Sequence, residues 1–490
     1  MNLKKKVFIF AMVICMFLTI SSAVAGDVND TQISVSENPS NDGIINSCDD
    51  NLISASSSGN FTELQNIINA AKTGDTITLE RDYTYNGDFN SPRGIIFIAN
   101  NLTIDGNGHT LNGLSKSRIL FILPGLAANK ITLKNITFKN GYTDSYGGSI
   151  LNMADLTITN CVFEKSYANI AGGAICSIGS LNCKNSNFNK NSANGSAGAI
   201  FSLNFEGSLQ YFNINLNVSN INEIKIIKNI LDNYEIKPMT DYITKCKFTN
   251  NFATAHGGAV YAYSHINIDS STFSSNKVNQ WGGAVFAAKN LVIKNSKFTK
   301  NSASIYGGAV FFKFHEITGY YDNQGTWQSD VKFYSNLIEN CVFTENVAKS
   351  RGGAIYGLKS LQKPNVSPKL AVKCTFSDNK APEGKDVYGG TVSNCVYKNT
   401  KLTLNTVKVK KSAKKLTLTA TLKKGSSPLV NKYVTFKFKG KVYKAKTNSK
   451  GVAKATVKSN VLKNLKIGSK VTYQASYASF SVKKTAKVYR

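Results

Sequence analysis

The chain has 490 residues, of which 42% are hydrophobic and 18% are charged, and its formal net charge is +30. This apolar content excludes a disordered polypeptide, and the length allows two or three folded domains. A net charge this far from zero favours an anionic partner.

The N-terminus has the pattern of a secretory signal. Three lysines at 4–6 precede an apolar run over 7–20, and Ala-Val-Ala at 23–25 supplies the small residues that a signal peptidase accepts. We expect residues 1–25 to be removed and 26–59 to form a linker. The apolar run falls short of the roughly 20 residues that span a bilayer. We therefore expect no transmembrane anchor, and a secreted or cell-surface, extracellular protein.

A short helix is predicted early in the mature chain, where Leu64, Ile67, Ile68 and Ala71 make one apolar face. The open end of a stacked β structure exposes strand edges and core, which need a cover. We expect this helix to be the N-terminal cap of a domain spanning residues 60–400.

Two motifs recur about every 25 residues within that domain. Glycine pairs, one of them degenerate, begin at residues 147, 172, 197, 257, 282, 307, 352 and 389. An aromatic residue precedes most pairs by nine positions, at Phe138, Phe163, Phe188, Phe248, Phe273, Phe298, Phe343 and Phe376. Asparagine follows most of these aromatics by three positions, at Asn191, Asn251, Asn276, Asn301, Asn346 and Asn379. Two motifs in one register indicate a structural repeat with three insertions.

The residues inside a repeat predict strands. In "LVIKNSKF" (291–298) the pattern is a short alternation of apolar and polar residues, without a helical stripe. A repeat this short cannot bury its own core, so copies must stack, with equivalent strands pairing in parallel about 4.8 Å apart. Glycine pairs allow sharp corners. We therefore expect an all-β fold: a right-handed parallel β-helix with coils of about 25 residues.

Two columns of polar or small residues share this register. Residues two positions before the aromatic should face the interior with it; they are Ile136, Cys161, Ser186, Cys246, Ser271, Ser296, Cys341, Cys374 and Cys395. Packing as free small residues is favoured for these cysteines, although an exported chain leaves a disulfide ladder or a metal site open. The asparagine column is expected to form a ladder of amide hydrogen bonds at coil corners.

The three insertions each follow a strand that begins at a glycine pair, so they should leave the solenoid from the same side. The first contains an expected amphipathic helix over 221–236, and the short third one follows Tyr356. Loops on a rigid solenoid commonly carry recognition.

The second insertion concentrates aromatic side chains that suit recognition. We expect His315, Tyr320, Tyr321 and Trp327 to bind the ligand, because exposed aromatic rings offer rigid contact area for sugars or proteins. The alternative is that these rings pack against the solenoid wall.

Residues 401–490 hold 23 lysines, one arginine and no acidic residue, so they carry +24 and leave only 30 − 24 = +6 for the other 400 residues. Alternating patterns predict a small Ig-like β-sandwich, and "TNSKG" (447–451) predicts a hairpin turn. The expected strands cover 415–422, 432–440, 453–459 and 470–477. An anionic cell-envelope polymer is the partner that this charge favours, and nucleic acid is not expected because no nucleic-acid motif is present.

The motif pair Phe298-Thr-Lys-Asn301 with Gly307-Gly-Ala-Val310 resembles those of chlamydial polymorphic membrane proteins. The order of signal, β-helix with "LQNIINAAKTGDTITL" and Ig-like module with "YKAKTNSKGVAKATV" resembles the adhesin-like surface proteins of methanogenic archaea over almost the whole chain. The resemblance implies a secreted or cell-surface adhesin whose partners are glycans or surface proteins of another cell. It brings no site residues.

A polysaccharide-active enzyme on the same fold is the rival hypothesis, because pectate lyases and related glycosidases share the right-handed β-helix. "IDGNGHT" (104–110) and "AHGG" (255–258) are superficially similar to glycosidase motifs, but paired carboxylates do not accompany them. Asp105 is interpreted as a turn residue, and His109 and His256 as surface or corner residues. We expect no catalytic residue, cofactor or metal. A purely structural wall protein is the third hypothesis.

Overall fold

The structure, a computed structural model of the whole chain, describes residues 58–87, 94–97, 101–123, 130–203, 207–208, 235–236, 240–321, 327–358, 369–397, 400–424, 427–477 and 480–490. The expected signal peptide and all but the last two residues of the expected linker lie outside these ranges. Within them, no helix is long and apolar enough to cross a bilayer.

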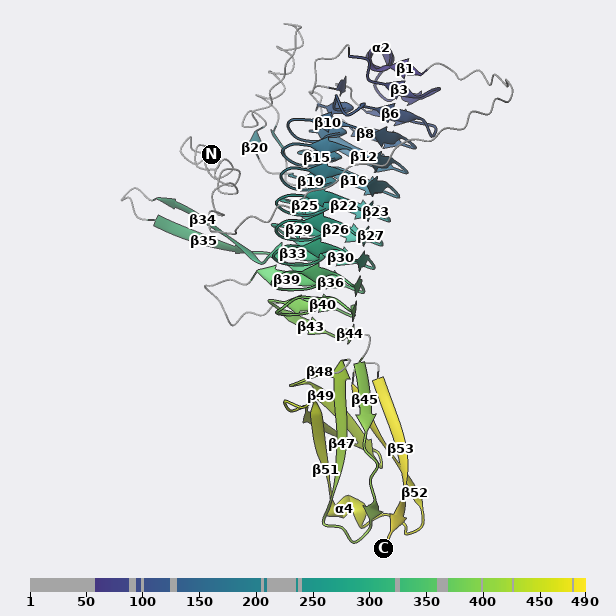
Figure 1. Cartoon of the computed structure of the whole chain (residues 1–490), viewed down its shortest axis with the longest axis vertical. Helices are drawn as coiled ribbons and strands as arrows, with labels where there is room; N and C mark the ends of the chain where they lie inside the picture. Colours follow the sequence, from purple (N-terminus) through teal and green to yellow (C-terminus); the bar gives the residue numbers. More distant parts are fainter. Residues whose placement is uncertain are drawn as a thin grey trace, which may run out of the picture.

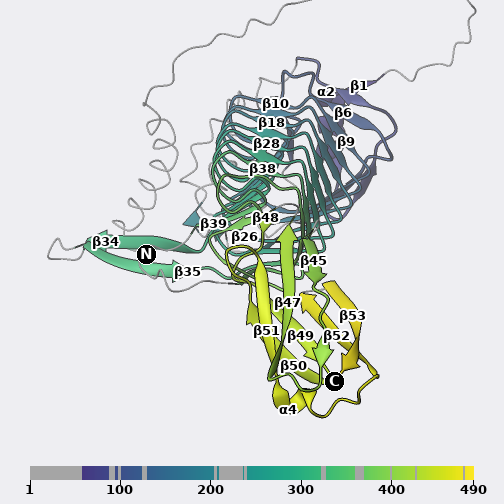
Figure 2. The same ribbon diagram turned by 60° about the horizontal axis from the view of Figure 1, so that its bottom comes forward.

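The chain winds into a right-handed parallel β-helix, whose stacked coils run down the upper part of Figure 1 and are seen more nearly along the axis in Figure 2. A complete coil contributes one strand in turn to each of four parallel sheets, which we number 1 to 4 in that order. Equivalent strands pair in register, as Phe163 with Phe188 and Ile175 with Ile200. The predicted fold class is therefore confirmed.

Sheet 1 comprises β1 (Gly59–Asn60), β3 (Tyr83–Thr84), β6 (Thr110–Asn112), β9 (Thr137–Lys139), β13 (Val162–Glu164), β17 (Asn187–Asn189), β23 (Lys247–Thr249), β27 (Thr272–Ser274), β31 (Lys297–Thr299), β37 (Val342–Thr344), β41 (Thr375–Ser377) and β44 (Val396–Tyr397). Sheet 2 comprises β10 (Tyr142–Thr143), β14 (Tyr167–Ala168), β18 (Ser192–Ala193), β24 (Phe252–Ala253), β28 (Lys277–Val278), β32 (Ser302–Ala303) and β38 (Val347–Ala348).

Sheet 3 comprises β4 (Ile95–Phe97), β7 (Leu120–Ile122), β11 (Ile150–Asn152), β15 (Ile175–Ser177), β19 (Ile200–Ser202), β25 (Val260–Ala262), β29 (Val285–Ala287), β33 (Val310–Lys313), β39 (Ile355–Leu358) and β42 (Val387–Tyr388). Sheet 4 comprises β2 (Thr76–Thr78), β5 (Leu102–Asp105), β8 (Lys130–Lys134), β12 (Asp155–Thr159), β16 (Leu181–Lys184), β22 (Thr240–Thr244), β26 (His265–Asp269), β30 (Leu291–Lys294), β36 (Asn336–Glu339), β40 (Lys369–Val372) and β43 (Thr391–Ser393).

The interior of the solenoid is a column of stacked phenylalanine rings. Consecutive rings from Phe138 to Phe343 lie 4.6 to 4.8 Å apart between centroids, nearly parallel, and are fully buried. This spacing equals the separation of paired strands, so the repeat brings each ring onto its equivalent in the next coil. The Ala and Ile or Val that follow the pairs at 172, 197, 257, 282, 307 and 352 belong to the same buried cluster, as predicted.

The asparagine column forms the predicted ladder. Each Asn from Asn191 to Asn346 donates from Nδ2 to Oδ1 of its equivalent in the next coil, at 3.1 Å for Asn191 with Asn251 and 2.9 Å for Asn276 with Asn301. The same Nδ2 also donates to a phenylalanine carbonyl, which satisfies polar groups that the corner leaves without strand partners. The residue before each ladder Asn has a left-handed backbone: Lys190, Asn250, Ser275, Lys300, Glu345 and Asp378.

The cysteine and serine column occupies a second corner of the coil and is buried. Its thiols and hydroxyls donate to the carbonyl two residues earlier, as Ser186 Oγ does to Lys184 at 2.7 Å. The seven cysteines in the described residues are free, and burial raises the pKa of the Cys161 thiol to about 12. These side chains therefore pack and also cap the corner, a hydrogen-bonding role that we did not predict.

The two glycines of a pair have different reasons to be glycine. The first has φ between +63° and +72°, as at Gly282. The second, such as Gly283, has no room for a side chain, because a Cβ would overlap the Gly308 carbonyl oxygen in the next coil. The prediction that a glycine pair at residue 389 continues the repeat is wrong. Gly384 occupies the position equivalent to Gly352, since Ile355 pairs with Val387.

The helix α2 (Phe61–Ala70) caps the first coil (Figure 1). Asn60 is its N-cap and accepts a hydrogen bond from the Glu63 amide at 2.9 Å. Phe61, Leu64 and Ile68 join the solenoid core. Ile67, which we placed on the apolar face, is 41% exposed.

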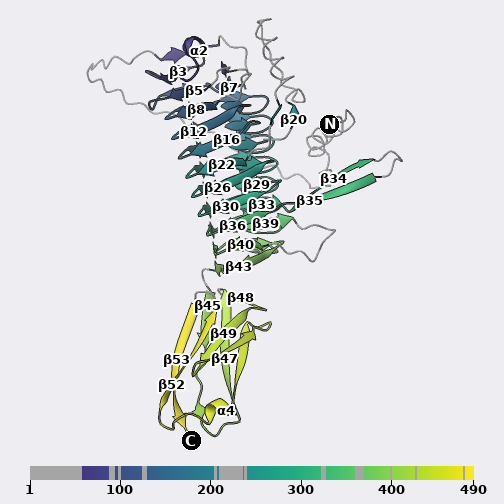
Figure 3. The same ribbon diagram turned by 180° about the vertical axis from the view of Figure 1, so that it is seen from behind.

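The C-terminal residues form a β-sandwich of two sheets below the last coil (Figure 3). Sheet 5 comprises β45 (Thr400–Leu404), β47 (Lys415–Lys424), β48 (Ser427–Pro428) and β51 (Val452–Lys458). Sheet 6 comprises β46 (Val409–Lys410), β53 (Phe480–Tyr489), β52 (Lys470–Tyr477), β49 (Tyr433–Phe438) and β50 (Lys441–Lys446). The helix α4 (Ser459–Leu462) follows β51. The sandwich core shares no residue with the solenoid core.

The turn 447–451 does not close a hairpin, contrary to our prediction. It exists, with Asn448 Oδ1 accepting from the Lys450 and Val452 amides, but β50 pairs with β49 and β51 pairs with β47. The turn therefore carries the chain from one sheet to the other. A turn motif specifies a local reversal of direction, whereas strand partners depend on which apolar faces pack together.

Candidate functional site

A second aromatic stack runs along the outside of the solenoid on sheet 3. The second residue of each sheet 3 strand from β19 to β42 points away from the interior core and is aromatic: Phe201, Tyr261, Phe286, Phe311, Tyr356 and Tyr388. Their centroids lie 4.7 to 5.2 Å apart. The stack forms apolar clusters separate from the interior core. We call it the outer aromatic stack.

The residue before each glycine pair covers this stack. Trp281 lies 5.3 Å from Phe311, and Tyr306 lies 4.7 Å from Tyr356, measured between ring centroids. Trp281 and Tyr306 themselves stay partly exposed. The result is a narrow ridge of half-exposed aromatic rings on a rigid strand scaffold, which is the kind of surface that recognises sugars or proteins.

Cations line the edge of the ridge. Lys289 Nζ lies 4.8 Å from the centre of the Tyr263 ring, and the Arg351 guanidinium lies 5.1 Å from that of Tyr388. The indole nitrogen of Trp281 is buried and has no hydrogen-bond partner among the described residues.

His256 belongs to this ridge rather than to the solvent-exposed surface. It is at the corner that we predicted, but it is 7% exposed and packs against Tyr261, Trp281 and Phe286. Burial, assisted by the positive charge of Lys313, lowers its pKa to about 4. The imidazole is therefore neutral at physiological pH and acts as part of the apolar cover.

The insertions leave the coils at one edge of sheet 3, as predicted. They follow β19, β33 and β39, which belong to that sheet, and in Figures 1 and 3 the described parts of the first two insertions lie on one side of the solenoid. Of the first insertion the structure describes β20 (Gly207–Ser208) and β21 (Glu235–Ile236), an antiparallel pair. The predicted helix lies outside the described residues except for 235–236, which are strand. The third insertion lies outside them too.

The second insertion is a β-hairpin of β34 (His315–Tyr321) and β35 (Trp327–Phe333), which projects from the solenoid in all three overall views. Strand pairing places Tyr321 opposite Trp327 and Tyr320 opposite Gln328, so the backbone brings the predicted residues to the far end of the hairpin. The side chains of Tyr320, Tyr321 and Trp327 lie outside the described part, and their binding role stays a prediction.

His315 lies at the base of the hairpin, away from the other three predicted residues. Its ring is 6.3 Å from that of Phe333, and burial lowers its pKa. Nδ1 of His315 is buried without a partner in the described residues. The structure thus separates the predicted set into one residue beside the solenoid and three at the hairpin end.

The residues that suggested an enzyme have structural roles. Asp105 Oδ1 accepts from the Asn107 amide at 3.0 Å, which is the turn we predicted, and from Asn135 Nδ2 at 2.9 Å. These hydrogen bonds, with Lys134, lower the pKa of Asp105. His109 is partly exposed and pairs with Asp82 through Nδ1 at 3.2 Å.

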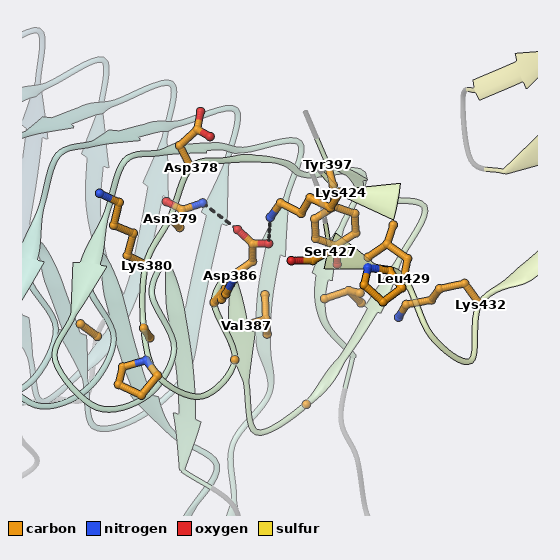
Figure 4. Close-up of a pocket in the computed structure, with 18 of the residues that line it drawn as sticks. Asp378, Asn379, Lys380, Asp386, Val387, Tyr397, Lys424, Ser427, Leu429 and Lys432 are labelled. Atoms are coloured by element: carbon orange, nitrogen blue, oxygen red, sulfur yellow. Dashed lines mark hydrogen bonds and ion pairs between the residues drawn. The ribbon is translucent and has the colours of Figure 1, made fainter. Parts of the chain in front are cut away.

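A hollow of about 1100 Å³ lies where the last coils meet the β-sandwich (Figure 4). Its lining mixes apolar residues with the lysines Lys349, Lys380, Lys385, Lys424 and Lys432. Figure 4 shows Asp386 at its centre, between Asn379 of the solenoid and Lys424 of the sandwich.

Asp386 is the joint between the two domains. It is 8% exposed and stands at the coil position that Ala354 holds one coil earlier. One carboxylate oxygen accepts from Nδ2 of Asn379 at 3.0 Å, and the other pairs with Lys424 Nζ. The asparagine ladder therefore ends on a carboxylate that also holds the sandwich.

Sequence reasoning missed the outer aromatic stack and the joint. The sequence does contain a signal for the stack, because an aromatic residue follows Gly-Gly-Ala-Val or Gly-Gly-Ala-Ile at Tyr261, Phe286, Phe311 and Tyr356. It contains no signal for Asp386, since a single carboxylate in a degenerate coil shows no periodicity.

The coils are similar to a known repeat. The model of the Chlamydia polymorphic membrane protein repeat matches residues 245–263, 270–288 and 340–358. Each matched segment runs from a sheet 1 strand to a sheet 3 strand. It therefore contains a phenylalanine of the inner column, an asparagine of the amide ladder, a glycine pair and a residue of the outer aromatic stack. No curated protein and no solved structure matches the chain. The similarity therefore concerns the repeating coil alone, and the matched residues are a minor part of the chain.

Proposed function

We propose that this protein is a secreted or cell-surface adhesin-like protein. Its β-helix presents loops to glycans or surface proteins of another cell, and its basic, Ig-like C-terminal module associates with an anionic polymer of the envelope. The arrangement resembles that of the adhesin-like surface proteins of methanogenic archaea. The observation that carries the proposal is the departure of all three insertions from one edge of sheet 3.

The geometry of that edge supports binding of an extended partner. The first two insertions leave β19 and β33, which are three strand spacings apart in sheet 3, or about 14 Å. The half-exposed rings of Tyr261, Trp281 and Tyr306 lie along the same sheet. A surface of this length suits an oligosaccharide or a polypeptide segment better than a small molecule.

A double substitution at the hairpin end tests the binding role. Tyr321→Ala with Trp327→Ala should abolish binding of chain 26–490 to a glycan array or to whole cells, because it removes two of the proposed contact rings. The melting temperature should stay within a few degrees.

The matched control removes two exposed aromatic rings elsewhere, with Tyr242→Ala and Tyr433→Ala, which are 45% and 59% exposed. It should leave binding unchanged. A sharp loss of stability with unaltered binding in the hairpin variant would show that the hairpin covers the solenoid and does not recognise a partner.

Salt dependence tests envelope association. Chain 26–490 should sediment with isolated envelopes at low salt and be released in about 1 M NaCl, where the screening length is only about 3 Å. Binding that persists unchanged at that salt concentration would exclude an electrostatic association.

A further inference from the structure

The outer face of sheet 5 places lysines directly opposite lysines. Strand pairing sets Lys401 against Lys423 and Lys415 against Lys458, and all four side chains are exposed. Like charges directly opposite on neighbouring strands are only about 5 Å apart at Cβ and destabilise a sheet. Such pairs persist more readily if an external anion neutralises them.

The protein supplies almost no internal anion for these charges. Residues 401–490 contain no Asp or Glu. Among the described residues, the one ion pair that a lysine of the sandwich makes is that of Lys424 with Asp386, at the domain joint. The two lysine pairs therefore face solvent without a carboxylate.

A row of hydroxyl groups connects the two pairs. Thr417, Thr419 and Thr421 alternate along β47 on the same face as Lys415 and Lys423. On β51, Thr456 lies opposite Thr417, and Lys454 lies opposite Thr419. The nine residues from Lys415 to Lys423 span eight residue steps, or about 27 Å. The face is thus a straight track, cationic at both ends and rich in hydroxyls between them.

The chemistry of the track favours one class of partner. In the described part of the sandwich, the exposed large apolar side chains are Val430, Tyr433, Val442, Ile467 and Tyr489, and none of them lies on sheet 5. Interfacial membrane proteins add inserted apolar side chains to their cations, and proteins that bind single-stranded nucleic acid add aromatic rings on which the bases stack. The exposed side chains of sheet 5 supply neither. Threonine hydroxyls both donate and accept hydrogen bonds, which suits the hydroxyls of a sugar.

We propose that the outer face of sheet 5 binds a linear acidic polysaccharide that lies along β47. The lysine pairs at the two ends hold its anionic groups, and the threonine row hydrogen-bonds the sugar hydroxyls between them. This inference rests on the proposed envelope association and adds the face and the chemical class of the polymer.

The test uses chain 26–490 with polygalacturonate oligomers as the probe, measured by calorimetry at low salt. The sheet 5 variant carries Lys401→Gln, Lys415→Gln, Lys423→Gln and Lys458→Gln. The control removes the same charge from the exposed positions of sheet 6, with Lys437→Gln, Lys444→Gln, Lys470→Gln and Lys487→Gln. The sheet 5 variant should lose at least about tenfold in affinity and the control less than about threefold.

Equal losses in the two variants would overturn the assignment of the face and leave a general attraction between charges. A wild-type chain that sediments with envelopes but does not bind polygalacturonate would overturn this inference and leave the proposed function unaffected. A chain that binds neither would overturn both.

The threonine row has its own test. Thr417→Val with Thr456→Val keeps the β-branched shape but removes two hydroxyls. It should weaken binding of polygalacturonate about threefold and binding of inorganic polyphosphate less, because polyphosphate offers the threonines acceptor oxygens but no hydroxyl that donates to them. Equal affinity of variant and wild type for polygalacturonate would contradict the role of the row. Tighter binding of phosphatidylglycerol vesicles or a DNA oligonucleotide, lost in the sheet 5 variant, would reassign the face.

Discussion

The solenoid and the β-sandwich differ in what lies opposite their lysine side chains. In the solenoid, lysines meet carboxylates of a neighbouring coil: Lys139 with Glu164 at 3.6 Å, and Lys294 with Glu339 at 3.7 Å. In the sandwich, lysines of neighbouring strands meet each other. Exposed ion pairs contribute little stability, but opposed like charges cost some. The difference shows that the charge of the sandwich does not serve its own fold.

The two regions also differ in what holds them together. The solenoid repeats the same contacts in every coil, through phenylalanine stacks, amide ladders and glycine corners, so each coil depends on its neighbours. The sandwich has one compact core between two sheets. Because the cores share no residue, we expect two separate unfolding transitions in chain 26–490.

Gly283→Val should have the largest effect, and on the solenoid transition alone. The added side chain would overlap the backbone of the next coil, so we expect a loss of about 3 kcal/mol or more in the free energy of unfolding. Calorimetry should show the solenoid transition at a lower temperature and the sandwich transition unchanged. The control, exposed Lys294→Ala, should cost less than about 1 kcal/mol. The reverse order would contradict the placement of corners and faces.

Acid should destabilise the solenoid and spare the sandwich. The pKa of His256 is about 4 when folded and about 6.5 when unfolded, so the unfolded chain binds the proton first as pH falls. The stability that this group contributes is present above pH 6.5 and is lost between about pH 6.5 and 4, up to about 3 kcal/mol. Residues 401–490 contain no His, Asp or Glu, so their transition should not move.

His256→Gln is the control for the pH effect. It should flatten the pH dependence of the solenoid between pH 6.5 and 4, leaving the part due to His315, whose pKa is also lowered by burial. Carboxylates such as Asp105, whose pKa is lowered from 3.8, contribute mainly at lower pH. A sandwich transition that shifts as much as the solenoid would contradict the comparison.

Asn301→Ala should interrupt the amide ladder. It leaves the Phe273 carbonyl and a neighbouring ladder amide without their partners in a buried corner, which we expect to cost about 2 kcal/mol. Denaturant titration followed by aromatic circular dichroism would report the solenoid. Exposed Asn279→Ala is the control and should change the midpoint little. Equal shifts of the unfolding midpoint in the two variants would show that the ladder does not stabilise the solenoid.

Asp386→Asn should uncouple the two regions at a cost of about 1 to 2 kcal/mol. The substitution keeps the side-chain size but removes the charge that Lys424 pairs with and one acceptor for Asn379. Hydrogen exchange should increase in 377–388 and around Lys424, while the middle coils keep their protection. Unchanged exchange on both sides of the joint would show that the contact does not couple them.

Lys458→Glu should have the smallest effect, and in the stabilising direction. It converts the opposed pair with Lys415 into an attractive one, which we expect to raise the stability of the sandwich by about 0.5 kcal/mol. The same change should weaken binding of an anionic polymer. Lys470 and Lys487 form the equivalent pair on sheet 6, and Lys487→Glu should stabilise as much without weakening that binding. Equal weakening would contradict the preference for sheet 5.

Periodicity made much of the solenoid readable from the sequence. The register of Phe163, Phe188 and their equivalents predicted the coil, the inner stack and the amide ladder, because each is a contact between a residue and its own copy. The edge from which the insertions leave followed from the same register. Of the candidate site, sequence reasoning located the hairpin residues 320, 321 and 327 but joined them with His315, which the strand pairing sets apart.

Only the tertiary structure decided the contacts between residues that are not copies of one another in the repeat. Asp386 meets Asn379 and Lys424 across a domain joint, and the turn at 447–451 connects two sheets instead of closing a hairpin, because strand partners and domain contacts depend on how whole faces pack. The composition of 401–490 determined that the sandwich is strongly basic. Whether its lysines would face carboxylates or one another depended on the strand register, which a local sequence pattern does not encode.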